Sequence, residues 1–310
     1  MEIRHLHNGQ IRRELWDQAV KGSLNGKIYN LSWYLDAISP GWHALVADNY
    51  RMVMPLTWRK KYGISYLCQP LLSQQAGIIS GTPVAPEQVL EFLTRIPARF
   101  KLAEITLNFG NPVVPGPFWF EWHTTYLLNL NRPYGEIATH YSVNHRRNIR
   151  KASEQNLFFT SEVHQEEYLA LLEQDQSHGS QILLSARNKP LLIRLISAMI
   201  RQRTGIIFGT RSPDGTLVAA VLTGIDRNVL YYLAPAMTGE GHERRAMFHL
   251  VDRVIDQYAG QEFTLDFEGS DIENVARFYK GFGPAAQSYP SLRYSRLPAI
   301  LKTLAPRRFR

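Results

Sequence analysis

Apolar and polar positions follow the same order twice along this chain. In each half, three stretches rich in β-branched and aromatic residues are separated by turns that carry Asp, Asn, Pro or Gly. These stretches predict strands, and the short turns between them predict an antiparallel meander. The last strand of each meander is expected to stop at Pro70 or Pro235, because proline cannot donate to a neighbouring strand. The predicted strands are 42–47, 51–58 and 63–70, and then 205–210, 216–225 and 228–235.

A helix and one further strand follow each meander. Apolar side chains recur at helical spacing after each proline, and a Thr-Leu-X-Phe string comes next, in which X is Asn108 or Asp266. A strand, a helix and a strand in this order predict a parallel pair joined by a crossover helix. The predicted helices are 86–100 and 242–258. The strands after them begin at 104 and 262, which are 158 residues apart. A last strand is predicted to close each half, at 124–130 and 291–297.

The matched order predicts two copies of one fold. A single recurring tetrapeptide could arise by chance, but the shared order of meander, proline, helix and strand favours duplication. We therefore expect a mixed α/β (α+β) protein with two tandem domains, residues 1–133 and 134–310. Each domain is expected to contain a mixed sheet with an antiparallel meander and a crossover helix.

A basic segment opens the second copy. Ser142 is a favourable N-cap, and the predicted helix after it carries four cations and no acid between residues 142 and 151. Such a cluster suits a phosphate or another polyanion, since arginine grips oxyanions through two parallel hydrogen bonds. A solvated basic face is the alternative. The four cations are Arg146, Arg147, Arg150 and Lys151.

This order of elements resembles the GNAT (acyl-CoA N-acyltransferase) fold, and two copies with a basic helix at the start of the second resemble the Fem-type peptidyltransferases and related acyltransferases. Three segments carry the likeness: residues 141–152, residues 230–235 with the loop and helix after them, and residues 265–283. The resemblance implies an N-acyltransferase in which the second copy is catalytic and the first is a scaffold on the acceptor side. The implied acceptor is an amine on a small molecule, a cell-envelope precursor or a peptide.

The resemblance also implies a donor, acyl-CoA, with aminoacyl-tRNA as the alternative. GNAT enzymes hold the pyrophosphate of CoA in a glycine-rich turn at a helix start. The turn here departs from that pattern through Glu240 and Glu243, which sit where an anion would approach. The chain also has no long charged helical hairpin of the kind that some Fem-type enzymes use for tRNA, so both donors stay open. The residues in the position of the cofactor turn are Gly239, Gly241, Arg244 and Arg245.

Forming an amide requires a group that takes the proton of the amine. Asp266 and Glu268 lie near the carboxyl end of a predicted parallel strand, where α/β sheets bind ligands, and alternate strand positions place them on one face. Alternatively, Asp266 caps the following helix or pairs with Arg277. The first copy has Asn108 and Gly110 at the equivalent places, which favours a single active copy.

Two further side chains are candidates for the same site. Tyr232 could protonate a leaving thiol or alcohol, although packing in the core is the alternative. Arg277 could hold a carboxylate or a phosphate. With Asp266 and Glu268, Tyr232 completes the set of candidate catalytic residues.

Composition narrows the class of protein. The 310 residues include 35 Lys+Arg against 27 Asp+Glu, and the resulting net charge of +8 favours anionic partners. The single cysteine, Cys68, excludes a disulfide within the chain and a multi-cysteine metal site, and we expect no metal. No apolar run is long enough to span a membrane and no signal peptide is evident, so a cytoplasmic location is expected.

A non-catalytic protein that binds a ligand or a nucleic acid is the alternative to an enzyme. The basic helix and the C-terminal Arg307-Arg308-Phe309-Arg310 supply the positive charge that nucleic acids attract. No zinc-finger or RRM signature accompanies that charge.

Overall fold

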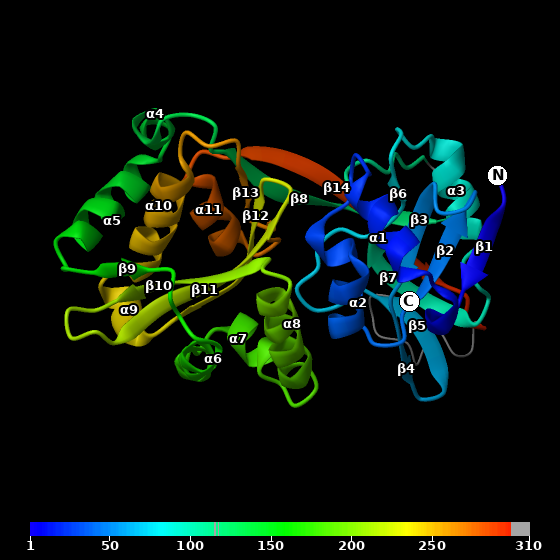
Figure 1. Ribbon diagram of the computed structural model, residues 1–310, viewed down its shortest axis with the longest axis horizontal. Helices are drawn as coiled ribbons and strands as arrows, with labels where there is room; N and C mark the ends of the chain where they lie inside the picture. The colour runs from blue at the N-terminus through cyan, green and yellow to red at the C-terminus, as the bar shows by residue number, and fades with distance from the viewer. Residues whose placement is uncertain (115, 117, 299–310) are drawn as a thin grey trace. The chain divides into compact units, whose positions relative to one another are not determined.

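The computed structural model of the protein describes residues 1–114, 116 and 118–298 (Figure 1). They form two compact units, the first made of Met1–His123 with the chain from Ser288 onward, and the second of Thr124–Gln287. The division falls inside two strands, β8 (Trp119–Asn129) and β14 (Ala285–Ser295). The basic C-terminal residues 307–310 lie outside the described residues.

The first unit contains an antiparallel sheet in the order β1-β2-β3-β6. Every residue of its two central strands is buried. The helix α1 contributes Trp16 and Val20 to the core. The elements are β1 (Ile3–Leu6), α1 (Arg13–Lys21), α2 (Ser32–Ile38), β2 (His43–Ala47), β3 (Met52–Leu56) and β6 (Ile79–Ser80), with single 3-10 turns at Asn8–Gln10 and Ile28–Asn30.

A second set of strands in the first unit has the order β4-β5-β7-β14. β5 and β7 are parallel, as predicted, and α3 lies between them in the chain. Apolar side chains from α3, both sets of strands and β14, among them Phe92, Met54 and Leu292, form one core. The elements are β4 (Trp58–Lys61), β5 (Ile64–Cys68), α3 (Pro86–Thr94) and β7 (Phe100–Thr106).

The second unit has a sheet in the order β8-β13-β12-β11-β10-β9. Strands β10, β11 and β12 form the predicted antiparallel meander, and β12 and β13 form the predicted parallel pair across α10. The strands are β9 (Phe158–Thr160), β10 (Gly205–Arg211), β11 (Leu217–Asp226), β12 (Val229–Met237) and β13 (Thr264–Asp266). The helices are α4 (Tyr134–Thr139), α5 (Val143–Ser153), α6 (Gln165–Gln174), α7 (His178–Leu183), α8 (Lys189–Arg201), α9 (Gly239–Glu243), α10 (Ala246–Tyr258) and α11 (Glu273–Lys280).

Helices cover both faces of this sheet (Figure 1). On one face, α4, α10 and α11 pack against the strands through a core that includes Ile137, Leu250 and Tyr279. On the other face, the hydroxyl of Tyr168 on α6 donates to the carbonyl of Ala234 on β12 at 2.8 Å. The predicted basic helix is α5, and the side chain of Ser142 caps it by accepting from the backbone N–H of His145.

The predicted closing strands pair with the opposite halves of the sequence. Residues 127–129 of β8 pair with β13 in the second unit, and residues 291–295 of β14 pair with β7 in the first. The prediction that 124–130 closes the first copy and 291–297 the second is therefore wrong, and the two units differ accordingly from the expected ranges 1–133 and 134–310. Local sequence specifies a strand and its buried face, but not the strand that it pairs with.

Several strand boundaries also differ from the prediction. β12 continues through Pro235, which lies opposite Val221, and ends at Met237, because a strand tolerates the loss of one donor. The predicted strand 51–58 is divided at Thr57, and its two parts, β3 and β4, lie in different sheets. Thr57 nevertheless stays tied to β5, since its hydroxyl donates to the carbonyl of Cys68 at 2.7 Å.

Candidate functional site

The parallel strands β12 and β13 separate within the second unit. They pair only from Val229 to Tyr231 on β12, where Tyr231 lies opposite Asp266. β12 then continues to Met237, and no strand of the described chain pairs with residues 232–237 on the β13 side. We call this feature the β12–β13 divergence. The carboxyl end of a strand in a parallel pair is the part of an α/β sheet that binds ligands.

A β-bulge lies in β12 at the start of this divergence. Thr223 of β11 pairs with Tyr232 and Leu222 pairs with Ala234, so Leu233 is an extra residue. The backbone of a bulged residue is left out of the ladder, and bulges are common beside active sites. Sequence reasoning missed Leu233, because an apolar strand gives no local signal of where its register shifts.

Asp266 and Glu268 lie at the divergence but do not share a strand face. β13 ends at Asp266, and Glu268 has a left-handed backbone with φ of 57°. The prediction from strand alternation is therefore wrong for this pair. Asp266 is fully buried and its Oδ1 accepts from the hydroxyl of Thr125 at 2.6 Å and from the backbone N–H of Glu268 at 3.0 Å. Asp266 thereby fixes the turn that presents the half-buried Glu268.

The first unit repeats this turn with different chemistry. Oδ1 of Asn108 accepts from the backbone N–H of Gly110 at 2.9 Å, the same i to i+2 bond that joins Asp266 and Glu268. Asn108 is also fully buried and accepts from Asn25 at 2.9 Å. The two turns share this hydrogen bond, but Glu268 has a left-handed backbone and Gly110 does not, and only the second turn carries carboxylates.

The two tyrosines of β12 are both buried. The Tyr232 hydroxyl donates to the sulfur of Met247 at 3.1 Å, and burial raises the pKa of Tyr232 well above its ordinary value. This placement corresponds to the core-packing alternative for Tyr232. Burial likewise raises the pKa of Tyr231, and the negative charges of Asp266, Asp226 and Glu268 raise it further.

The proposed cofactor turn forms a short helix, α9, and the start of α10. Its N-cap is Thr238, whose hydroxyl oxygen accepts from the backbone N–H of Gly241 at 3.0 Å. A Cβ on Gly241 would lie 2.2 Å from the carbonyl oxygen of Val218, so this glycine is required by packing, whereas a Cβ on Gly239 would meet nothing within 4 Å.

The arginines of the same turn make local contacts. The guanidinium of Arg244 pairs with Glu240 at 2.7 Å, which reduces the charge available to an anion. Arg245 has a left-handed backbone with φ of 61° and donates to the carbonyl of His242 at 3.2 Å.

The four cations of α5 have different environments. Arg146 donates to the carbonyls of Thr139 and Tyr141, at 3.2 and 2.7 Å, and so closes the end of α4. Arg147 is exposed and donates to the side chain of Asn144 at 2.9 Å. The Arg150 and Lys151 side chains are exposed and pair with no described residue. Those two cations are the most available to an external anion.

The basic helix is attached to the end of α11 through His145. Its ring is buried, lies within 2.9 Å of the Ser142 hydroxyl and 2.8 Å of the Phe278 carbonyl, and packs edge-on against Phe282. A Cβ on Gly281 would lie 1.8 Å from that ring. Burial lowers the pKa of His145, which fits a neutral structural ring.

Arg277 is an exposed residue of α11. It is 70% exposed and pairs with Glu273 at 2.7 Å, one turn earlier on α11. The helix begins at Glu273 and its N-cap is Ile272, so Asp266 does not cap it. An exposed pair of this kind contributes little to stability.

Comparisons with known proteins agree with this geometry. Residues 140–280 match the family model described as "Acetyltransferase (GNAT) domain". Among solved structures, the chain resembles FemX with a TM-score of 0.65 at 13% identity, over 94% of this chain and 97% of that one. It also resembles a tandem GNAT protein from the clavulanic acid biosynthesis pathway, with a TM-score of 0.53 at 10% identity, over 96% and 100%. It also resembles a conserved protein of unknown function from Bacteroides thetaiotaomicron, with a TM-score of 0.57 at 11% identity, over 91% of this chain and 95% of that one.

Residues 140–280 thus match a GNAT domain model, and the chain as a whole has the fold of tandem GNAT proteins. The predicted fold class and the predicted resemblance to Fem-type proteins are confirmed. No curated protein matches the sequence. In the described residues, no helix is long and apolar enough to cross a membrane.

Proposed function

We propose that the second unit transfers an acyl group from an acyl-CoA thioester to an amine at the β12–β13 divergence. The observation that carries the proposal is the end of strand pairing at Tyr231 and Asp266, beside a bulge on one strand and a carboxylate turn on the other. The GNAT fold supports acyl transfer in general. The acceptor we propose is an amine on a small molecule or a peptide.

In the proposed reaction, the amine nitrogen bonds to the acyl carbon and the carbon–sulfur bond of the thioester breaks. The Glu268 carboxylate takes the proton that the amine loses and releases it to solvent, and the departing thiolate takes up a proton from solvent, so that one amide and one free thiol form. Glu268 suits the role of base because its backbone is fixed by Asp266 while its side chain remains half-buried.

Two other groups have supporting roles in the proposal. The backbone at Leu233, which the bulge releases from the ladder, supplies a donor for the oxyanion that develops on the acyl carbon. Asp266 is a positioning residue, because it is buried and acts through the turn that carries Glu268. We propose a non-catalytic role for the first unit, where Asn108 and Gly110 replace these carboxylates.

One observation favours a second donor, the ester of an aminoacyl-tRNA. Arg244 of the cofactor turn is paired with Glu240, whereas Arg147, Arg150 and Lys151 on α5 are exposed. Exposed cations on one helix suit the phosphates of a nucleic acid. In this version the same amine attack breaks a carbon–oxygen bond, and the departing ribose oxygen of the tRNA takes up the proton and becomes a hydroxyl.

The experiment that tests the proposal is a comparison of donors with purified full-length protein. Acyl-CoA thioesters and aminoacyl-tRNAs are each incubated with a panel of amines, and mass spectrometry detects the amide while a thiol assay detects released CoA. We expect amide formation with one donor class, and a loss of about 10²-fold or more in the Glu268→Gln variant. Binding of a donor without any amide product would favour a non-catalytic ligand-binding protein, and binding of unacylated RNA alone would favour the nucleic-acid alternative.

A further inference from the structure

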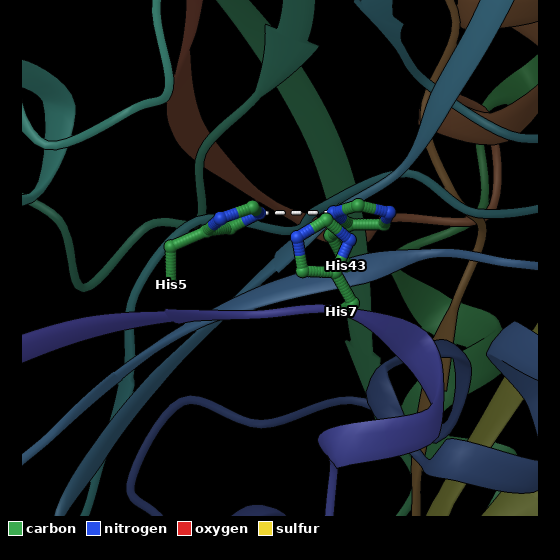
Figure 2. A group of neighbouring side chains, drawn as sticks. All are labelled: His5, His7 and His43. Atoms are coloured by element: carbon green, nitrogen blue, oxygen red, sulfur yellow. Dashed lines mark hydrogen bonds between the residues drawn. The ribbon is translucent and has the colours of Figure 1, made fainter.

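Three histidines lie together in the first unit. His5 is on β1, His7 follows β1, and His43 begins β2 (Figure 2). One ring nitrogen from each lies within 4.8 Å of the others, and Nε2 of His5 is 2.9 Å from Nδ1 of His43. Among the described residues, no other group of His, Cys, Asp and Glu side chains has this spacing. We call these three residues the histidine cluster.

The strand pairing of β1 and β2 produces the cluster. His5 and His7 are two residues apart on an extended segment, so their side chains point to the same side. The antiparallel register pairs His5 with Leu45 and Leu6 with Ala44, and its continuation places His7 opposite His43. Facing side chains in such a pair have Cβ atoms about 4.5–5.5 Å apart.

The most buried member of the cluster is held firmly by aromatic rings. His43 is 5% exposed, and the rings of Trp58 and Phe100 pack against it edge-on at 5.6 and 6.1 Å. His7 is exposed and His5 is half-buried, so the cluster is open to solvent on the His7 side. A fixed inner ligand with an accessible outer one allows an ion to enter without unfolding the sheet.

We propose that the histidine cluster binds a divalent transition-metal ion, with Zn²⁺ as the best fit. Imidazole nitrogen is a favoured ligand of zinc, at about 2.0–2.1 Å, and three histidines with a fourth open position form a tetrahedral site. Tetrahedral ligands at that length are about 3.3 Å apart. Side-chain rotations of the exposed His7 and the half-buried His5 bring the nitrogens from their present separations, all under 4.8 Å, to that spacing.

A neighbouring arginine predicts the kind of ligand that completes the site. The Arg99 guanidinium lies 3.0 and 3.2 Å from the two ring nitrogens of His43. The positive charge of Arg99 repels the positive charge of a bound metal ion. We therefore expect the fourth ligand of the metal to be an anion, such as a carboxylate, that balances this repulsion. The Arg99 guanidinium can pair with the same anion.

This site differs from the expectation that the protein binds no metal. That expectation rested on the single cysteine. His43 is 38 residues from His5, and only the pairing of β1 with β2 brings them together.

Metal titration of the tag-free, full-length protein tests the proposal. After treatment with a chelator, Zn²⁺ is titrated by calorimetry, and Co²⁺ is titrated while the visible absorption that marks tetrahedral coordination is recorded. We expect one ion per chain and a tetrahedral Co²⁺ spectrum. The His7→Ala variant, which changes an exposed side chain, is expected to weaken binding at least tenfold, because loss of a group that only hydrogen-bonds to a metal ligand already costs about 10–100-fold.

The matched control is His178→Ala, which removes an exposed histidine on α7 in the second unit. It should bind metal as the unaltered protein does. The proposal is overturned if the unaltered protein binds no Zn²⁺, or if a His5→Gln/His7→Gln variant of unchanged circular dichroism binds it equally well. Arg99→Gln should tighten Zn²⁺ binding in a buffer without coordinating anions, and an unchanged affinity there would contradict the role given to Arg99.

Discussion

The hydroxyl of Thr125 donates a 2.6 Å hydrogen bond to Oδ1 of Asp266, although the two residues are 141 positions apart in the chain. The same oxygen accepts from the backbone of Glu268. One buried atom therefore connects β8, the end of β13 and the turn that presents the candidate base.

Replacing Thr125 with valine should destabilise the protein by about 1–3 kcal/mol, because Asp266 is fully buried and would lose a hydrogen-bond donor. Urea unfolding measures the change. Thr139→Val, which alters an exposed hydroxyl on α4, is the control and should change stability by less than about 0.5 kcal/mol. Equal effects of the two substitutions would show that the Thr125–Asp266 bond contributes nothing particular.

Glu268→Gln should lower the rate of amide formation by about 10²-fold or more while the protein stays folded, because glutamine cannot take the amine proton. The control is Glu273→Gln, which removes an exposed carboxylate that pairs with Arg277. Asp266→Asn keeps an oxygen at the position that accepts from Thr125. Asn108 of the first unit shows that an amide oxygen can accept the backbone bond of such a turn. The effect of Asp266→Asn on kcat should therefore be smaller than that of Glu268→Gln. A larger effect for Asp266→Asn would exchange the roles of base and positioning residue.

Gly281→Ala should destabilise the protein by about 1–3 kcal/mol, because the new Cβ would lie 1.8 Å from the ring of His145. Gly281 has φ of −66°, so the clash and not the backbone causes the effect. In the background of His145→Ala, the same substitution should cost at least about 0.5 kcal/mol less. Gly135→Ala, whose Cβ would meet nothing within 4 Å, is the control for urea unfolding.

The cations of α5 should separate into two kinds when they are replaced. Arg146→Ala should lower stability, since Arg146 donates to two carbonyls at the end of α4. A combined Arg150→Ala/Lys151→Ala variant should leave stability unchanged and raise the KM of the donor, with a weaker dependence on salt. Unchanged KM values for both donor and acceptor would mean that Arg150 and Lys151 bind neither substrate and only contact solvent.

Stability should fall as the pH is lowered from about 6.5 to about 4. Burial, followed by the charge of Arg253, lowers the pKa of His249 to about 4, whereas an unfolded histidine titrates near 6.5. Between these values the unfolded chain binds a proton that the native chain does not, so stability rises with pH in this window and levels off above it. His249→Gln should reduce the slope by up to one proton, as measured by urea unfolding at a series of pH values. An unchanged slope would mean that His249 does not contribute.

Several elements could be predicted because their signal is local. The meander β10–β12, the N-cap at Ser142 and both crossover helices follow from hydrophobic spacing and turn residues within short segments. The repeated Thr-Leu-X-Phe strings predicted the equivalence of Asn108 and Asp266, and both residues make the same hydrogen bond to the residue two positions later.

Other features depend on which distant segments meet. The pairing of β8 with β13 and of β14 with β7, the bulge at Leu233 and the partner of Asp266 leave no mark in the local pattern. The amino-acid sequence by itself determined the meander β10–β12, the crossover helices, the repeated order of elements and the residue types at the candidate site. Only the tertiary structure decided the strand partners, the buried position of Asp266 and the meeting of His5, His7 and His43. The reason is that side-chain periodicity sets which face of an element is buried, whereas long-range packing sets which elements lie beside it.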